Sequence, residues 1–491
     1  MGKKRSKHPK QSTIVAPPRA SLGSMLATMW PRLLAVFAGS ALAFILIGMP
    51  PIVGGTVVRA LVAGLVAGLC VRTWNDLLPT VVASGLGVAM ASTGLGTFYA
   101  ANGATPAASD LIAAPLVVVL VAAGFGAIAL LAKRAWFEWV ALALVAVAFG
   151  LSIGVLPGQV SDATAGVRSE FATEPQAEQY NFDGALFLRT EYLMEHGTPY
   201  YDAYIQAFDG DSRLQGTPPG LFNIRQPWLF WMWRYLPGTA GVKIRGWFAF
   251  WALVTAGCGY LLARRFVEPG IALLAPIALC GYLSWPMFST WLTLSEFWAG
   301  CVAVWFLTAM VYRRWLLGAL LMVVAFALRE LLLFLVPVYL VWWFAAGRPK
   351  KAITGVAIAV LGPFTLLGLH AMWSPVHAQS GGGLAFWLQG GLPRLIDALR
   401  FSGGLVPLSA VLYLLAPVAA LAGALLAKPR WAMALLGAAV LVPVIALAIF
   451  SNGQWGYYWG AIAMPSILAL VPLAATRLMP AAVPLEESAV R

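Results

Sequence analysis

The stretch WLLGALLMVVAFALRELLLFLVPVYLVWWFAA, residues 315–346, decides the fold, because it holds two adjacent charges inside an otherwise unbroken apolar run. These two charges are Arg329 and Glu330. Ionised side chains inside a membrane are costly, and they usually face a protein interior or a water-filled cavity. The stretch is therefore either one long helix with a self-neutralising pair or two short arms that turn at the charges.

The composition of the whole chain is that of a polytopic helical membrane protein. Of the 491 residues, 60% are hydrophobic and 10% are charged, and long apolar runs recur. The net charge of +13 does not indicate nucleic acid, because basic residues come in small clusters between apolar runs, as in cytoplasmic loops. The cysteines all lie inside apolar runs, which indicates packed thiols rather than disulfides or metal ligands.

The apolar runs predict about 13–14 transmembrane segments, including one short hairpin. The first run is too long for a signal-peptide core and is interpreted as a retained span. The candidate spans are 33–53, 55–71, 77–98, 111–132, 137–157, 246–263, 270–289, 292–311, 315–328, 331–346, 352–370, 405–427, 431–450 and 457–475.

The charge pattern favours the hairpin for 315–346. If the N-terminal tail is cytoplasmic, the basic clusters at 313–314 and 348–351 both belong to the cytoplasmic side. One continuous helix would be about 48 Å long and would place the two clusters on opposite sides. Two arms of about 21–24 Å keep both clusters inside and leave the charged pair at a tip below the outer surface. Polar backbone at that depth needs protein or a water-lined cavity around it.

The predicted organisation has two membrane parts and two larger outer loops. The Gly/Ala-rich first part carries Gly64 and Gly68 at a spacing suited to close helix packing. The predicted segments are a basic cytoplasmic tail at 1–32, an accessory bundle at 33–132, a transmembrane core at 133–475 with an outer loop at 158–245 and a glycine-rich flap at 371–404, and a cytoplasmic tail at 476–491.

The first outer loop predicts helices at the membrane interface. In NFDGALFLRTEYLMEHGTPYY (181–201), apolar residues recur at helical spacing, with Asn181 or Asp183 as N-cap and Gly197 and Pro199 as the stop. This pattern predicts an amphipathic helix lying along the interface. In GLFNIRQPWLFWMWRYLPG (220–238), the aromatic residues after Pro227 predict docking at headgroup level.

Polar chemistry gathers at the outer face. The chain has no Walker loop, no HExxH motif and no Cys/His cluster, and charged residues are not spread across the bilayer as an ion-coupled pump requires. An enzyme acting on a membrane lipid with a polar head fits this arrangement better than an alternating-access transporter does.

The first outer loop resembles that of the GT-C superfamily, which comprises integral-membrane glycosyltransferases using polyprenyl-phosphate-linked sugars. The likeness rests on an interfacial helix that opens at Asp183, the HGTPYYDAY turn (196–204) and the Pro-aromatic segment after Arg225, and it covers roughly 137–475. Many members carry paired acidic residues at the start of this loop, whereas Asp183 stands alone behind Tyr180 and Asn181.

The resemblance implies an inverting transfer of a sugar from a lipid phosphate to a lipid, glycan or protein acceptor. Such a transfer needs a carboxylate base and cations for the phosphate. Asp183 is the expected base, and Arg329 and then Arg225 are the expected phosphate ligands. Expected to orient groups or contact sugar are Glu330, Glu296, Tyr200, Tyr201 and His370, with Trp455 and Tyr457 as further stacking candidates.

Each assignment has a plainer alternative. Asp183 can be only an N-cap, Arg225 an interfacial anchor, and Glu296 and His370 polar residues at helix ends. The alternative function is a lipid-linked saccharide flippase or another transporter. No cofactor is indicated, a divalent metal is left open, and no nucleic-acid partner is expected. The charge pattern fits a bacterial inner membrane with both termini cytoplasmic, while a eukaryotic organelle is left open.

Overall fold

The structure is a computed structural model in which the described residues form helices, turns and loops, without strands. The described residues are 22–46, 55–101, 108–131, 134–155, 182–209, 224–237, 240–288, 290–375, 388, 390–400, 407–450 and 456–481. An isolated β-bridge pairs Val267 with Pro480. The prediction of an all-helical membrane protein is confirmed for this part of the chain.

Within the described ranges, seven helices are long and apolar enough to cross a membrane. They are α1 (Leu22–Leu46), α3 (Trp74–Ala101), α4 (Ala108–Leu131), α11 (Ala240–Arg264), α12–α13 (Pro269–Ala272 and Leu274–Ser284, continued by η2, Trp285–Phe288), α17 (Ile353–Trp373, after η5, Lys350–Ala352) and α21 (Arg430–Ile449).

Shorter apolar helical stretches account for the other predicted spans. They lie in α2 (Gly55–Cys70), α5 (Arg134–Val155), α14 (Ser295–Val311, after η3, Thr290–Thr293), α15 (Trp315–Leu328), η4–α16 (Glu330–Phe334 and Leu335–Ala345), α20 (Pro407–Leu426) and α22–η8 (Gly460–Leu470 and Val471–Ala475, after η7, Gly456–Trp459). Every predicted span thus falls on a helix. Several of the long helices contain proline, which neighbouring helices make tolerable inside a membrane.

The helix that contains the first predicted span begins earlier than residue 33: α1 begins at Leu22 and continues through Pro31 and Arg32. Arg32 donates from Nη2 to the carbonyl oxygen of Cys70 at 3.1 Å and forms an ion pair with Asp76. These partners lie at the end of α2 and the start of α3. Because they compensate the charge of Arg32, the helix can continue through this residue, after which the span was predicted to begin.

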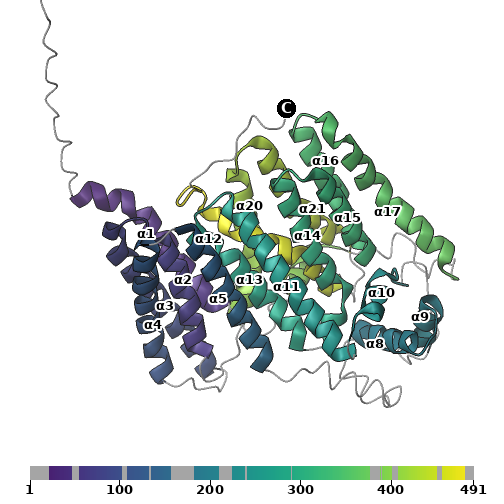
Figure 1. Ribbon diagram of the computed structural model, residues 1–491, viewed down its shortest axis with the longest axis horizontal. Coiled ribbons are helices and arrows are strands. Elements are labelled where there is room, and N and C mark those ends of the chain that lie inside the picture. Colours follow the sequence, from purple (N-terminus) through teal and green to yellow (C-terminus); the bar gives the residue numbers. More distant parts are fainter. Residues whose placement is uncertain are drawn as a thin grey trace, which may run out of the picture.

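The centre of the molecule is formed by α13, α14 and α22. All residues of α13 and α22 are buried, as are nearly all of α14. In Figure 1, α1–α4 form a bundle on one side of this centre, and α15, α16 and α17 lie on the other. The short helices α8 (Phe182–Glu195), α9 (Tyr200–Asp209) and α10 (Trp228–Tyr235) form a layer at one end of α14 and α15.

The predicted close packing of the first bundle is confirmed at its glycines. A Cβ atom at Gly64 would lie 2.7 Å from Val121, and one at Gly68 would lie 3.1 Å from the backbone nitrogen of Gly126. Helices α2 and α4 therefore approach each other across small residues, as membrane helices commonly do. The bundle is also tied to the centre by ion pairs from Arg72 and Arg32 to Glu268.

The predicted hairpin is confirmed. Trp315 begins α15, and its carbonyl oxygen accepts a hydrogen bond of 3.2 Å from the hydroxyl of Tyr339 near the end of α16. The ring centroids of Trp315 and Trp342 lie 5.6 Å apart. Residues 24 apart in one straight helix would be about 36 Å apart, so these contacts require two antiparallel arms. Arg329, with extended backbone at φ −154° and ψ 117°, is the turn residue.

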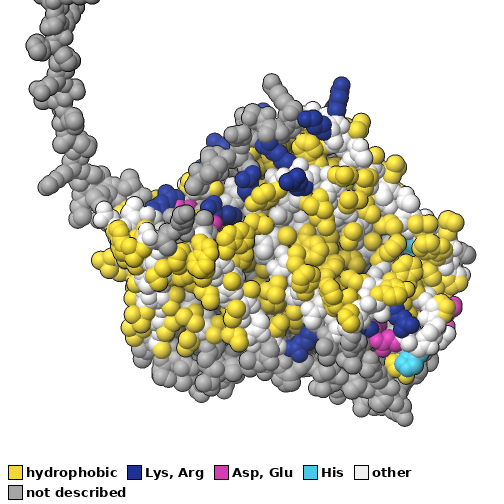
Figure 2. All heavy atoms as spheres, in the orientation of Figure 1, with side chains coloured by type: hydrophobic (Ala, Val, Ile, Leu, Met, Phe, Trp, Pro, Cys, Tyr) yellow, Lys and Arg dark blue, Asp and Glu magenta, His cyan; other side chains and the backbone are white. Residues whose placement is uncertain are grey.

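The basic loops share one face of the molecule. The guanidinium carbon of Arg265 lies 4.8 Å from the Tyr312 ring centroid, and that of Arg313 lies 5.6 Å from the Trp431 centroid. Arg264 pairs with Glu138, which brings the start of α5 to the same face. Figure 2 shows Lys and Arg side chains gathered along the upper edge of the view, above a wide hydrophobic belt. Their common location is the arrangement that the charge pattern predicted.

Candidate functional site

The short helices between α5 and α11 form a packed layer. Helix α8 ends at Glu195, and Gly197 follows with a φ of +95°, a conformation that glycine adopts without strain. The stop predicted at Gly197 and Pro199 is therefore confirmed. In α9, buried residues recur at helical spacing, namely Tyr200, Ala203, Tyr204, Ala207 and Phe208. This face packs on α8 and α10, with Phe187 and Phe230 in edge-to-face contact at 5.3 Å.

The prediction that α8 is an amphipathic helix with one exposed face is wrong, whereas its location at the membrane interface stays a prediction. Residues 186–191 are buried in succession, which a helix with one exposed face cannot achieve. The reason is that α9, α10 and η3 enclose α8. Lys243 of α11 reaches into this layer, where its Nζ pairs with Glu191 and lies 2.8 Å from Glu195 Oε1. Burial outweighs the attraction of Lys243 and raises the pKa of Glu191 to about 6.

A buried ionic triad occupies the tip of the hairpin. Arg329 Nε lies 2.7 Å from Glu296 Oε1, and Arg329 Nη1 lies 3.5 Å from Glu330 Oε2. The Arg329 and Glu296 side chains are 4% and 1% exposed, so this pair is almost fully removed from solvent. Ser295 Oγ donates to the other oxygen of Glu296 at 3.3 Å. The triad has two carboxylates for one guanidinium, so removing Arg329 would leave the buried carboxylate of Glu296 without a compensating charge.

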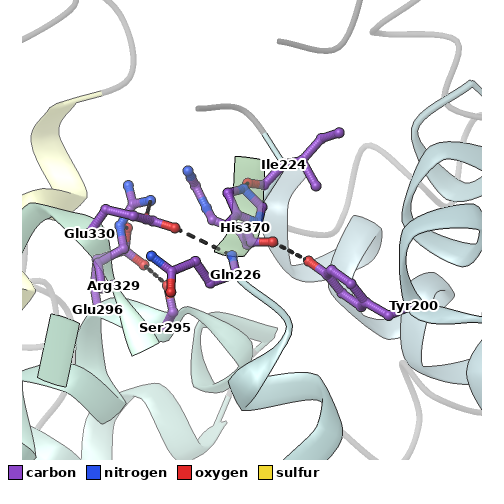
Figure 3. A network of polar contacts seen from close by, with 9 residues as sticks. Tyr200, Ile224, Gln226, Ser295, Glu296, Arg329, Glu330 and His370 are labelled. Atoms are coloured by element: carbon purple, nitrogen blue, oxygen red, sulfur yellow. Dashed lines mark hydrogen bonds and ion pairs between the residues drawn. The ribbon is translucent and has the colours of Figure 1, made fainter. Parts of the chain in front are cut away.

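Glu330 joins the triad to the layer of short helices. Its Oε1 accepts a 3.3 Å hydrogen bond from the backbone N–H of Gln226, just before α10. Gln226 Oε1 accepts from Trp228 Nε1 at 3.2 Å, while its buried Nε2 has no hydrogen-bond partner in the described part of the chain. Figure 3 shows Gln226 beside Ser295 and Glu296. An unpaired buried donor is costly and is a natural contact for an added acceptor.

The segment 224–226 is held from its other side by α9 and α17. The Tyr200 hydroxyl donates to the carbonyl oxygen of Arg225 (Figure 3). His370 Nε2 lies 3.1 Å from the carbonyl oxygen of Ile224, and His370 Nδ1 lies 3.0 Å from the Tyr201 hydroxyl. Burial raises the pKa of Tyr201 to about 12 and that of Tyr200 well above its ordinary value, so both hydroxyls remain protonated.

An apolar groove begins at the triad and runs between η4–α16 and α21–α22. Its volume is about 530 Å³, and Glu330 is its one charged lining residue among those described. The walls include Leu333, Ile445 and Phe450, which are 42%, 52% and 42% exposed. Because these walls reach the outer surface of the helices, the groove opens sideways toward the lipid. It combines a long apolar wall with a polar end.

The predicted site residues fall into three groups. Glu296, Arg329 and Glu330 are in direct contact, and Tyr200, Tyr201, Arg225 and His370 join them through the 224–226 segment. Tyr200 is 4% exposed and packs on neighbouring rings, so it orients the segment and presents no open face for stacking. Asp183 is the second residue of α8, but its side chain lies outside the described residues, as do Trp455 and the Tyr457 side chain.

Sequence reasoning missed several residues of the site. Gln226 lies in a motif that drew attention only for its arginine and aromatic neighbours, and Ser295 is apparent only once α14 is placed. The sequence gives a weak, indirect signal for Lys243: Glu191 and Glu195 are spaced i, i+4, so their carboxylates share one face of a helix and favour a cation beside it. The described residues contain no group of three or more His, Cys, Asp or Glu side chains that could hold a metal ion.

No protein-family model matches this sequence, and comparisons with curated proteins and with solved structures found no significant match.

Proposed function

We propose that the protein is a membrane glycosyltransferase that moves a sugar from a polyprenyl-phosphate donor to a lipid, glycan or protein acceptor. The observation that carries the proposal is the apolar groove of about 530 Å³ that ends at Glu330 of the buried triad. Apolar walls open to lipid suit a polyprenyl chain, and the adjoining guanidinium suits a phosphate. The basic face is then cytoplasmic, and the triad lies toward the opposite side of the membrane, which we assign to a bacterial inner membrane.

In the proposed reaction, the acceptor hydroxyl oxygen forms a bond to the anomeric carbon as the bond from that carbon to the phosphate oxygen breaks. The acceptor proton goes to Asp183, and the lipid phosphate leaves with the electron pair of the broken bond. Because Glu296 takes Arg329 Nε at 2.7 Å, the Nη groups remain for the phosphate. The 3.5 Å contact from Nη1 to Glu330 is the one that a phosphate oxygen would replace.

The other residues have supporting roles in this proposal. Arg225 adds a second cation on the segment next to Gln226, and its carbonyl oxygen is fixed by Tyr200. Tyr201 and His370 hold the same segment through the carbonyl of Ile224. The unpaired Nε2 of Gln226 is available to a phosphate or sugar oxygen. Preorganised donors of this kind stabilise charge that develops on a leaving phosphate.

The test is a transfer assay on the purified full chain with labelled polyprenyl-phosphate sugars and cell-envelope acceptors. Asp183→Asn should lower the transfer rate by about 10²–10⁴-fold, the usual effect of losing a general base. The matched control is Asp209→Asn, an exposed carboxylate at the end of α9, which should leave the rate unchanged. Absence of transfer with every donor, combined with movement of the intact lipid-linked sugar across vesicles, would favour the flippase instead.

A further inference from the structure

A second hollow lies on the basic face, and it shares no lining residue with the groove beside Glu330. It has a volume of about 770 Å³ and is formed where the end of α11, the turn between α20 and α21, and residues 476–481 meet. Four cations line it, namely Arg265, Lys428, Arg430 and Arg477, and no described carboxylate does. So much charge of one sign in one hollow is repulsive unless an anion occupies it.

The carboxylates of Glu268 and Glu138, which lie near the end of α11, are paired with cations outside the hollow. Glu268 pairs with Arg72 and Arg32, and Glu138 pairs with Arg264. None of the four hollow cations forms an ion pair with a carboxylate in the described part of the chain. The Nε of Arg265 is also buried without a hydrogen-bond partner there, while its guanidinium lies over Tyr312. This donor is fixed in place and unsatisfied.

The backbone adds donors at the same place. Helix α21 begins at Arg430, and its N-cap, Pro429, provides no side-chain hydrogen bond. The amides of Ala432 and Met433 both donate to the carbonyl oxygen of Pro429. The N–H groups that come before them, at the start of this 20-residue helix, face the turn between α20 and α21. Such a helix end favours anions through its exposed N–H groups and its dipole.

Most of the rest of the lining is apolar. It includes Phe266, Leu425, Leu426 and Met433, and Leu425 is 58% exposed whereas Phe266 is buried. The hollow lies at the ends of three helices that carry apolar stretches. A ligand that joins a phosphate to acyl chains matches both parts of this lining. We infer that this hollow binds the phosphate headgroup of an anionic phospholipid, independently of any catalytic function.

The test compares lipid retention by the full chain in nanodiscs of phosphatidylcholine doped with labelled phosphatidylglycerol. The triple variant Lys428→Gln/Arg430→Gln/Arg477→Gln keeps Arg265 and its contact with Tyr312. Each cation near an anionic lipid contributes about fivefold in affinity, so the triple variant should lose about 100-fold. The matched control is Arg348→Gln/Lys350→Gln/Lys351→Gln, which removes the same charge from exposed positions of the same face outside the hollow.

The expected result is strong loss in the triple variant, little loss in the control, and equal thermal unfolding of both proteins in detergent. Equal retention by the wild type and the triple variant would overturn the inference. Equal loss in the two variants would also overturn it, because surface charge alone would then account for binding. Displacement of the labelled lipid by inorganic phosphate at similar concentration would show a free-anion site and would overturn the lipid assignment.

Discussion

The buried pair of Arg329 and Glu296 permits a quantitative test of the hairpin tip. In Arg329→Met, Glu296 keeps its charge in a side-chain environment that is 1% exposed and loses its 2.7 Å partner. Removing one member of a buried pair typically costs about 3–5 kcal/mol. Glu296→Gln should cost less, about 1–3 kcal/mol, because Arg329 keeps Glu330. The double variant removes both buried charges and should be more stable than Arg329→Met alone, with a coupling energy of about 2 kcal/mol.

The assay is reversible unfolding of the purified protein in mixed detergent micelles, followed by tryptophan fluorescence. The control is Arg394→Met, the same substitution at an exposed position of α19 (Leu392–Arg400), which should change the free energy of unfolding by less than about 0.5 kcal/mol. If the costs of the two single variants simply add in the double variant, the pair is not coupled. The account of a preorganised triad would then be refuted.

Three further predictions concern topology, protonation and packing. Cysteines replacing Arg313 and Arg348 should both resist a membrane-impermeant thiol reagent in intact cells and react in opened membranes; labelling of one alone in intact cells would contradict the shared cytoplasmic face. The raised pKa of Glu191 means that its ionisation costs stability as pH rises from about 4.5 to about 6. Lowering the pH through that window should therefore raise the free energy of unfolding of the wild type, relative to that of Glu191→Gln, by about 2 kcal/mol. A difference between the melting curves of the two proteins that does not change with pH would contradict this. Gly64→Val places a side chain 2.7 Å from Val121 and should destabilise the first bundle by about 1–3 kcal/mol, whereas unchanged unfolding would show that α2 and α4 can separate.

The positions of helices and turns were predictable where residues close in sequence mark the end of a helix. Apolar runs located the helices, and the basic clusters at 313–314 and 348–351 required 315–346 to turn back, as the contact between Trp315 and Tyr339 confirms. The start of α1 was not predictable, because Arg32 is accommodated by Cys70 and Asp76, which come later in the chain. A charge marks a helix end only when no distant partner compensates it.

The site was predictable in part for the same reason. Arg329 and Glu330 stood out because burial of a charge is costly, and this holds whatever surrounds them. The contact with Glu296 and the burial of α8 depend on how α8, α10 and α14 pack, which no local pattern encodes. The groove beside Glu330 is formed by residues of η4–α16 and α21–α22, more than a hundred positions apart.

The central claim is that the groove beside Glu330 holds the lipid chain of a phosphate-linked sugar donor. It is tested most directly by photocrosslinking the full chain in membranes with a diazirine-bearing polyprenyl phosphate and mapping the labelled peptides. The account predicts adducts within 330–337 and 442–450, abolished by Ala446→Trp, which fills the groove, and retained in Leu441→Trp, which lies on α21 outside it. Adducts confined to other segments, or labelling unchanged by Ala446→Trp, would contradict the account.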